Sequence, residues 1–78
     1  MTASTPIDLS GIILFAHGSR DPLWKLPIEA VARRIRERQT EVLVDCAYLE
    51  LTTPDLPSVA SQMIASGAHH IRIVPMFL

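Results

Sequence analysis

An apolar stretch that ends abruptly at polar residues constrains the fold most. Residues 11–16 read Gly-Ile-Ile-Leu-Phe-Ala, and His17, Gly18 and Ser19 follow directly. Large apolar residues in succession, without polar alternation, are typical of a strand that is covered on both faces in a parallel α/β sheet. In such sheets ligands bind outside the carboxyl ends of the strands, so we expect His17 to face a ligand rather than the core.

Helices and further strands are predicted to follow this strand. Apolar residues recur twice at helical spacing, and a proline stands in the first turn of each predicted helix. The predicted elements are, in order, a strand over 11–16, a helix over 27–39, a strand over 42–49, a helix over 56–66 and a strand over 71–78. Each connection is long enough for a right-handed crossover. We therefore expect a three-layer α/β fold of β-α-β-α-β order with a parallel sheet, like half of a flavodoxin-like domain.

The two predicted helices have apolar faces that should pack on the sheet. The residues expected there are Ile28, Val31, Ala32 and Ile35 on the first helix, and Leu56, Val59, Ala60, Met63 and Ile64 on the second. Arginines interleaved with glutamates fill the other side of the first helix, which is typical of a solvated face. Asp55 or Thr53 is expected to cap the second helix, and Gly67 to stop it.

Composition narrows the class of protein. The 78 residues include seven basic and eight acidic side chains, a net charge of −1, so we expect neither nucleic acid nor an anionic membrane as the main partner. No apolar run reaches membrane-spanning length. The single cysteine, Cys46, lies in an apolar stretch and is expected to be a buried, inert thiol. These features predict a soluble protein of the reducing cytoplasm.

Residues 11–78 are expected to form part of one domain. Residues 1–10 lack the basic and long apolar regions of a signal peptide and are predicted to be a flexible N-terminal segment. Phe77 and Leu78 are large apolar residues at the carboxyl end of a strand, where an α/β domain continues into a loop and a helix. We therefore expect a domain that is incomplete at its C-terminus, either a fragment or a chain whose open sheet edge a partner covers.

Polar residues at the carboxyl ends of the first two strands form the candidate site. Glu50 follows its strand as His17 follows the first, so the two side chains should meet if these strands are neighbours. Imidazole and carboxylate can hold a borderline divalent metal with open positions, or act as general bases. Alternatively, His17 caps a turn and Glu50 is an ordinary exposed carboxylate. The two residues by themselves leave both interpretations open.

Three motifs in order resemble a known family. They are FAHGSRDP at 15–22 followed by Trp24 and Pro27, AYLELTTP at 47–54, and IVPMFL at 73–78. Together they are similar to the small CbiX-type sirohydrochlorin chelatases, over nearly the whole chain from Ile12 to Leu78. The resemblance implies a class II chelatase fold, homodimeric in its short forms. It also implies insertion of cobalt, or in relatives ferrous iron or nickel, into sirohydrochlorin for cobalamin or siroheme, without ATP or an organic cofactor.

The resemblance also implies roles for single residues. His17 would bind the incoming metal ion, and Glu50 would assist as a ligand or base. Arg20, with Ser19 beside it, is the residue best placed to orient the carboxylates of sirohydrochlorin. In the family, the last strand leads into a glycine-rich loop and a second metal-binding histidine, and this sequence ends before either. His69 and His70 are no substitute, because they are expected to be exposed loop residues at the amino end of the strands.

Other functions fit the residues less well. A histidine phosphatase needs an arginine directly before its histidine, where Ala16 stands, and an α/β-hydrolase needs a downstream nucleophile elbow with glycines. The remaining alternative is a non-catalytic metal-binding or dimerisation module, or an inactive truncated chelatase, which the missing second histidine favours. Trp24 is expected to pack in its loop rather than to stack on a ligand.

Overall fold

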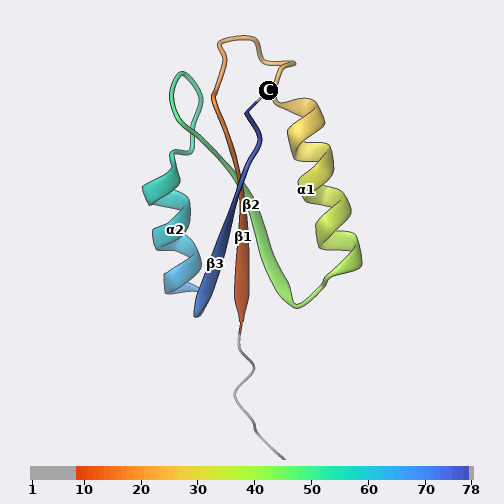
Figure 1. Ribbon diagram of the computed structural model, residues 1–78, viewed down its shortest axis with the longest axis vertical. Helices are drawn as coiled ribbons and strands as arrows, with labels where there is room; N and C mark the ends of the chain where they lie inside the picture. Colours follow the sequence, from red (N-terminus) through yellow and green to blue (C-terminus); the bar gives the residue numbers. More distant parts are fainter. Residues whose placement is uncertain (1–8, 78) are drawn as a thin grey trace, which may run out of the picture.

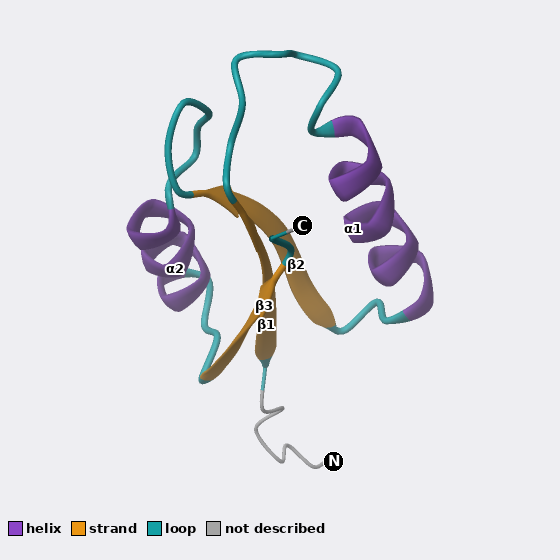
Figure 2. Ribbon diagram, turned by 45° about the horizontal axis from the view of Figure 1, so that its top comes forward, coloured by secondary structure: helices purple, strands orange, loops and turns teal. Residues whose placement is uncertain are grey.

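The computed structural model describes residues 9–77 and contains a three-stranded parallel sheet between two helices (Figure 1). The elements are β1 (Ser10–Ala16), α1 (Leu26–Arg38), β2 (Val42–Tyr48), α2 (Leu56–Ala65) and β3 (His70–Pro75). The strand order is β2-β1-β3, so β1 is central. The helices α1 and α2 lie on opposite sides of the sheet (Figure 2). The predicted three-layer β-α-β-α-β fold is confirmed.

The sheet divides the core into two parts, because successive residues of a strand point to opposite faces. Ile13 of β1 packs with Val59 and Met63 of α2, whereas Leu14 packs with Ala32 of α1. Both strand residues are buried. Coverage on both faces is what the unbroken apolar stretch predicted, and it leaves only the ends and edges of the sheet open to a ligand.

Two residues predicted for the core are exposed instead. Ile64 is 63% exposed and Val31 is 40% exposed. At 3.6 residues per turn, Ile64 lies about 140° around α2 from Val59, beyond the side of the helix that meets the sheet. Val31 faces a groove at the carboxyl end of the sheet, which is described below.

β1 and β3 begin one residue earlier than predicted, whereas β2 begins at Val42 as predicted. Ser10 belongs to β1, because it pairs with both Val42 and His70. The predicted flexible segment therefore cannot extend to Ser10, and its residues 1–8 lie outside the described residues. The prediction that His70 is a loop residue is wrong, since this pairing places it in β3. Both His70 and His69 are exposed, as predicted.

The last strand ends earlier than predicted. β3 stops at Pro75 instead of running to the end of the sequence, and Leu78 lies outside the described residues. The backbone N–H of Met76 still donates to the carbonyl oxygen of Phe15 at 2.7 Å. β1 continues to Ala16, one residue beyond its last pair with β3, which joins Phe15 and Pro75. β3 therefore does not flank the end of β1.

The helix ends follow their sequence signals. Pro27 lies in the first turn of α1, and the Asp55 carboxylate caps α2 by accepting a hydrogen bond from the Ser58 N–H at 2.9 Å. Gly67 ends α2 with a φ of 103°. Neither helix within residues 9–77 has the length and apolar character that crossing a bilayer requires.

The outer edge of β2 is covered by a side chain from α1. Arg36 donates from Nε and Nη2 to the carbonyl oxygen of Val44, at 2.9 and 2.7 Å, and lies 3.4 Å from a carboxylate oxygen of Asp45. Free strand edges invite pairing with other chains, and a charged side chain bonded to the edge prevents it. β3 forms the other edge of the sheet.

Candidate metal site at the carboxyl end of the sheet

The loops after β1 and β2 bring His17 and Glu50 into contact. The two strands are adjacent and parallel, with Ala16 opposite Tyr48, so both loops leave the same end of the sheet. His17 Nε2 lies 2.9 Å from Glu50 Oε1, and each side chain is 55% exposed. The predicted proximity of the two residues is confirmed, and both remain open to solvent and to a ligand.

Backbone pairing holds the two loops together beyond the strands. The N–H of Leu49 donates to the carbonyl oxygen of Ala16 at 2.9 Å, and the N–H of Glu50 donates to that of His17 at 3.0 Å. Gly18 follows with a φ of 106°, and a Cβ built on it would overlap the carbonyl oxygen of Glu50. Only glycine fits this close approach, which explains the His-Gly pair in the sequence.

The short contact between His17 and Glu50 bears on how His17 can act. A carboxylate only accepts, so a hydrogen placed between the two groups would have to be carried by Nε2 of the imidazole. In the neutral ring, Nδ1 then keeps its lone pair and is the atom able to bind a metal ion. Histidines that ligate metals commonly donate their other ring N–H to a carboxylate, which orients the ring. The geometry therefore fits a metal ligand with Glu50 beside it.

An apolar groove of about 720 Å³ opens next to His17. Its wall combines the end of β1, the first turns of α1 and the segment after β3: His17, Gly18, Trp24, Pro27, Ile28, Val31, Met76 and Phe77. The Phe77 ring meets the imidazole of His17 edge-on, with ring centroids 6.2 Å apart. A flat apolar ligand in this groove would lie against the imidazole, while its polar edge could remain in water.

Trp24 has a packing role, as predicted. Its ring lies against that of Tyr48, with centroids 6.1 Å apart, and its side chain is half-buried. This contact anchors the loop between β1 and α1 on β2. The same side chain contributes to the wall of the groove, so packing and contact with a ligand are compatible at this position.

Ser19 and Arg20 lie beside the groove but not in its wall. The Ser19 hydroxyl accepts a hydrogen bond from the N–H of Asp21 at 3.1 Å, which stabilises the turn. Arg20 is exposed and takes part in none of the ion pairs found among residues 9–77. A guanidinium without a carboxylate partner is available to an anion, but contact of either residue with a ligand remains a prediction.

His69 and His70 lie at the opposite end of the sheet from this site. His70 pairs with the first residue of β1, and His17 follows the last, so the strand rise of about 3.3 Å per residue separates them by about 20 Å. Within residues 9–77, no three His, Cys, Asp or Glu side chains come together in a way that could hold a metal ion. The described part of the chain thus provides two candidate ligands at one place.

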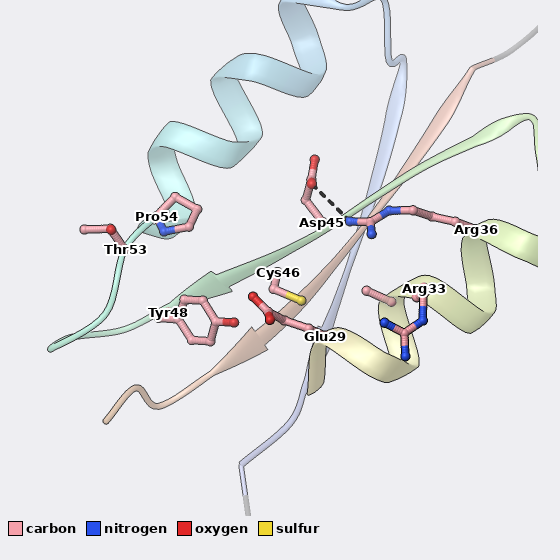
Figure 3. A pocket seen from close by; sticks show the side chains of 9 residues that line it. Glu29, Arg33, Arg36, Asp45, Cys46, Tyr48, Thr53 and Pro54 are labelled. Carbon is pink, nitrogen blue, oxygen red and sulfur yellow. Dashed lines mark hydrogen bonds and ion pairs between the residues drawn. The ribbon is translucent and has the colours of Figure 1, made fainter. Parts of the chain in front are cut away.

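A second pocket, of about 360 Å³, lies between α1 and β2 (Figure 3). Cys46 lies there with its Sγ 3.9 Å from the carbonyl oxygen of Ile28, half-buried where full burial was predicted. Burial raises the pKa of this thiol, which favours the protonated and less reactive form. The neighbouring Tyr48 hydroxyl is buried and has no hydrogen-bond partner among the described residues. Neither His17 nor Glu50 borders this pocket.

The sequence patterns missed two neighbours of the pair. Phe77 was read as part of a strand, and its contact with His17 depends on the chain leaving β3 toward the site. Thr52 was read as part of a loop that starts a helix, and the structure shows its hydroxyl bonded to the backbone of Ser19. Both contacts join distant segments, so no local pattern indicates them.

Comparison with known proteins decides the family. The family model described as CbiX matches residues 11–78. The chain belongs to the CbiX family. The crystal structure of a CbiX protein from Marinobacter aquaeolei has the same fold, with a TM-score of 0.71 and 32% sequence identity over 87% of this chain and 55% of that one. The predicted family and chelatase-type fold are confirmed.

Curated CbiX relatives have been named for two metals. The chain is 36% identical over 70 residues to the sirohydrochlorin cobaltochelatase of Methanococcus aeolicus, covering 90% of this chain and 49% of that protein. It is 31% identical over 71 residues to the chloroplastic sirohydrochlorin ferrochelatase of Arabidopsis thaliana, covering 91% of this chain and 32% of that protein. The chain spans about half the length of the cobaltochelatases it matches. Its similarity is thus to chelatases of one tetrapyrrole, with cobalt or iron as the metal.

Proposed function

We propose that this CbiX chain contributes the metal-binding part of a chelatase that inserts a divalent metal ion into sirohydrochlorin. The observation that carries the proposal is the His17–Glu50 pair at the mouth of an apolar groove. The names of the similar relatives supply the substrate, sirohydrochlorin. The ion is a substrate here, so it must be held weakly enough to be passed on.

The proposed mechanism divides two tasks between the pair. His17 binds the incoming ion through one ring nitrogen and replaces part of its water shell, while the exposed position leaves other coordination sites open. Insertion also requires the pyrrole N–H protons to leave the ring. Glu50, which lies beside the imidazole, is the proposed proton acceptor or additional ligand. Metal and base then reach the same point of the ring together.

The groove and its rim would orient the tetrapyrrole. The apolar wall, including Phe77 and Trp24, would contact the face of the macrocycle. Arg20 is the proposed partner of the peripheral carboxylates, with Ser19 as a hydrogen-bonding neighbour. No organic cofactor is needed for this reaction. Further metal ligands would come from elsewhere in the complete assembly, for which we propose a homodimer acting in the cytoplasm.

Cobalt is the proposed metal, with ferrous iron and nickel as alternatives. Several similar archaeal relatives are named for cobalt, and a similar plant relative is named for iron. An imidazole and a carboxylate do not rank these ions by themselves, because affinity follows the Irving–Williams order and supply sets the choice. Assignment to cobalamin rather than siroheme synthesis follows the same choice of metal.

The test measures metal binding and insertion separately. Cobalt binding is measured by calorimetry for the wild type and His17→Ala, and formation of cobalt-sirohydrochlorin is followed by absorbance. We expect His17→Ala to lose binding with its fold retained. The matched control is His69→Ala with His70→Ala, which should keep the wild-type affinity because both residues lie at the other end of the sheet. Unchanged affinity in His17→Ala would refute the metal assignment.

Insertion assays on the wild type and on Glu50→Gln separate a chelatase from a non-catalytic metal-binding module. An amide cannot accept the pyrrole protons, so we expect insertion to slow while folding is retained, since an exposed carboxylate contributes little to the core. If the wild type binds cobalt but forms no product in the presence of sirohydrochlorin, the module is the better description. A large loss of thermal stability in Glu50→Gln would make this residue structural.

A further inference from the structure

We infer that Thr52 is the positioning residue that holds Glu50 against His17. The inference rests on the proposed function, because it assigns a role within the same metal site. Among residues 9–77, the hydrogen bonds of the Thr52 hydroxyl go to Ser19 and not to either side chain of the pair. It acts on the two loops that carry them, through hydrogen bonds that reach from the loop after β2 to the loop after β1.

A single hydroxyl continues the pairing of the strands past their ends. Thr52 Oγ1 accepts from the backbone N–H of Ser19 at 3.1 Å and donates to the carbonyl oxygen of Ser19 at 2.7 Å. Both backbone groups of one residue are thus satisfied by one side chain. The preceding contacts of the same ladder, from Leu49 to Ala16 and from Glu50 to His17, are made by the backbone alone. Thr52 closes this ladder on the far side of the pair.

The loop that carries Glu50 needs such a restraint. Leu51 has a φ of 65°, a conformation that costs a residue with a side chain about 1–2 kcal/mol. The N–H of Thr52 donates to the carbonyl oxygen of Glu50 at 2.7 Å and closes a tight turn around this residue. The backbone of Thr52 therefore stabilises the turn itself. Its side chain attaches this turn to the loop after β1.

The contact between His17 and Glu50 does not fix its own geometry. Exposed pairs between long side chains are worth about 0–1 kcal/mol, because water screens the charges and the side chains lose freedom. A site that must present ligand and base at one point depends on supports that limit this freedom. The Thr52 bonds are the side-chain support that the structure shows between the two loops.

The experiment compares three single variants of the full chain. Thr52→Val keeps the branched shape and removes the hydroxyl, whereas Thr52→Ser keeps the hydroxyl. Thr53→Val is the matched control, because the adjacent hydroxyl makes no hydrogen bond among residues 9–77. One readout uses no metal: the NMR signals of the His17 ring and of the Ser19 and Glu50 amides, with their hydrogen exchange. The other is cobalt affinity by calorimetry.

We expect Thr52→Val to shift the His17 ring signals, speed exchange at Ser19 and weaken cobalt binding about tenfold, as loss of a ligand's support commonly does. Thr52→Ser should restore both readouts, and Thr53→Val should match the wild type. If Thr52→Val does not fold, Thr52→Ala provides the same loss of hydroxyl with less bulk. Wild-type ring signals and affinity in a folded variant lacking the hydroxyl would overturn the inference. Failure of the wild type to bind cobalt would instead overturn the proposed function, while the metal-free spectra would still decide the role of Thr52.

Discussion

Gly18 lies where one methyl group would separate the two loops of the candidate site. Gly18→Ala should lower the free energy of unfolding by more than the roughly 1–2 kcal/mol of a left-handed alanine, because its Cβ would also overlap the Glu50 carbonyl. Gly67→Ala is the matched control. Gly67 has a similar φ of 103°, but the nearest atom to its Cβ is 3.8 Å away. Equal losses in urea unfolding would show that the close approach at Gly18 is not what matters.

The half-buried Cys46 and the buried Tyr48 predict how stability depends on pH. Burial raises the pKa of Cys46 above 9.0 and that of Tyr48 above 10.0, their ordinary values. Both groups keep their protons to a higher pH in the folded chain than in the unfolded one, so their contribution to the free energy of unfolding should be constant below about pH 9 and fall as the pH rises further. Tyr48→Phe should reduce this fall above the ordinary tyrosine value. It should cost little at neutral pH, since the hydroxyl has no partner among residues 9–77. A loss of several kcal/mol at neutral pH would contradict this, and urea unfolding across the range measures both effects.

Arg36 links two elements, because it belongs to α1 and its side chain protects the outer edge of β2. Arg36→Ala should lower the free energy of unfolding by about 1 kcal/mol and free the Val44 carbonyl to pair with another chain. We therefore expect more aggregation as well as lower stability. Arg34→Ala is the control, because Arg34 is an exposed arginine of the same helix that takes part in none of the ion pairs described. Unfolding measurements and light scattering test both effects, and equal behaviour of the two variants would refute the protective role.

The elements of the fold could be predicted from the sequence, and their ends only in part. The apolar stretch 11–16 indicated a covered strand, because a strand that is buried on both faces has a continuous run of apolar residues instead of an alternation with polar ones. Strand ends depend on partners: Ser10 and His70 are in strands because they pair with each other. Helical spacing placed Val59 correctly but extended the buried face as far as Ile64, because spacing does not show how much of the helix circumference meets the sheet.

The pairing of His17 with Glu50 could be predicted from the sequence, but the residues that surround and support this pair could not. Parallel neighbouring strands were enough to bring His17 and Glu50 together, since the carboxyl ends of such strands share one edge. The Thr52 hydroxyl and the Phe77 ring join the site through tertiary contacts, which no local sequence pattern indicates. The roles of Ser19 and Arg20 are still predictions.

At the scale of the whole molecule, the open edge strand of the sheet exposes a large apolar side chain. Ile73 of β3 is 46% exposed, and β3 is an edge strand. We expect the chain to self-associate with rising concentration in sedimentation velocity, and Ile73→Lys to reduce this association because a charge on an edge strand opposes pairing. Ile64→Lys, on α2 and more exposed, is the control. If it reduces association equally, general apolar contact and not the edge is responsible.

The bond between Thr52 and Ser19 spans 33 residues, so the candidate site exists only when β1, α1 and β2 have closed into one unit. On the proposed function, a metal ion held by both loops binds the folded chain and not the unfolded one. Its binding free energy then adds to that of folding, by about 2.7 kcal/mol when the free ion is at 100 times its dissociation constant. We expect the metal supply to determine how long such a small chain survives proteolysis in the cell.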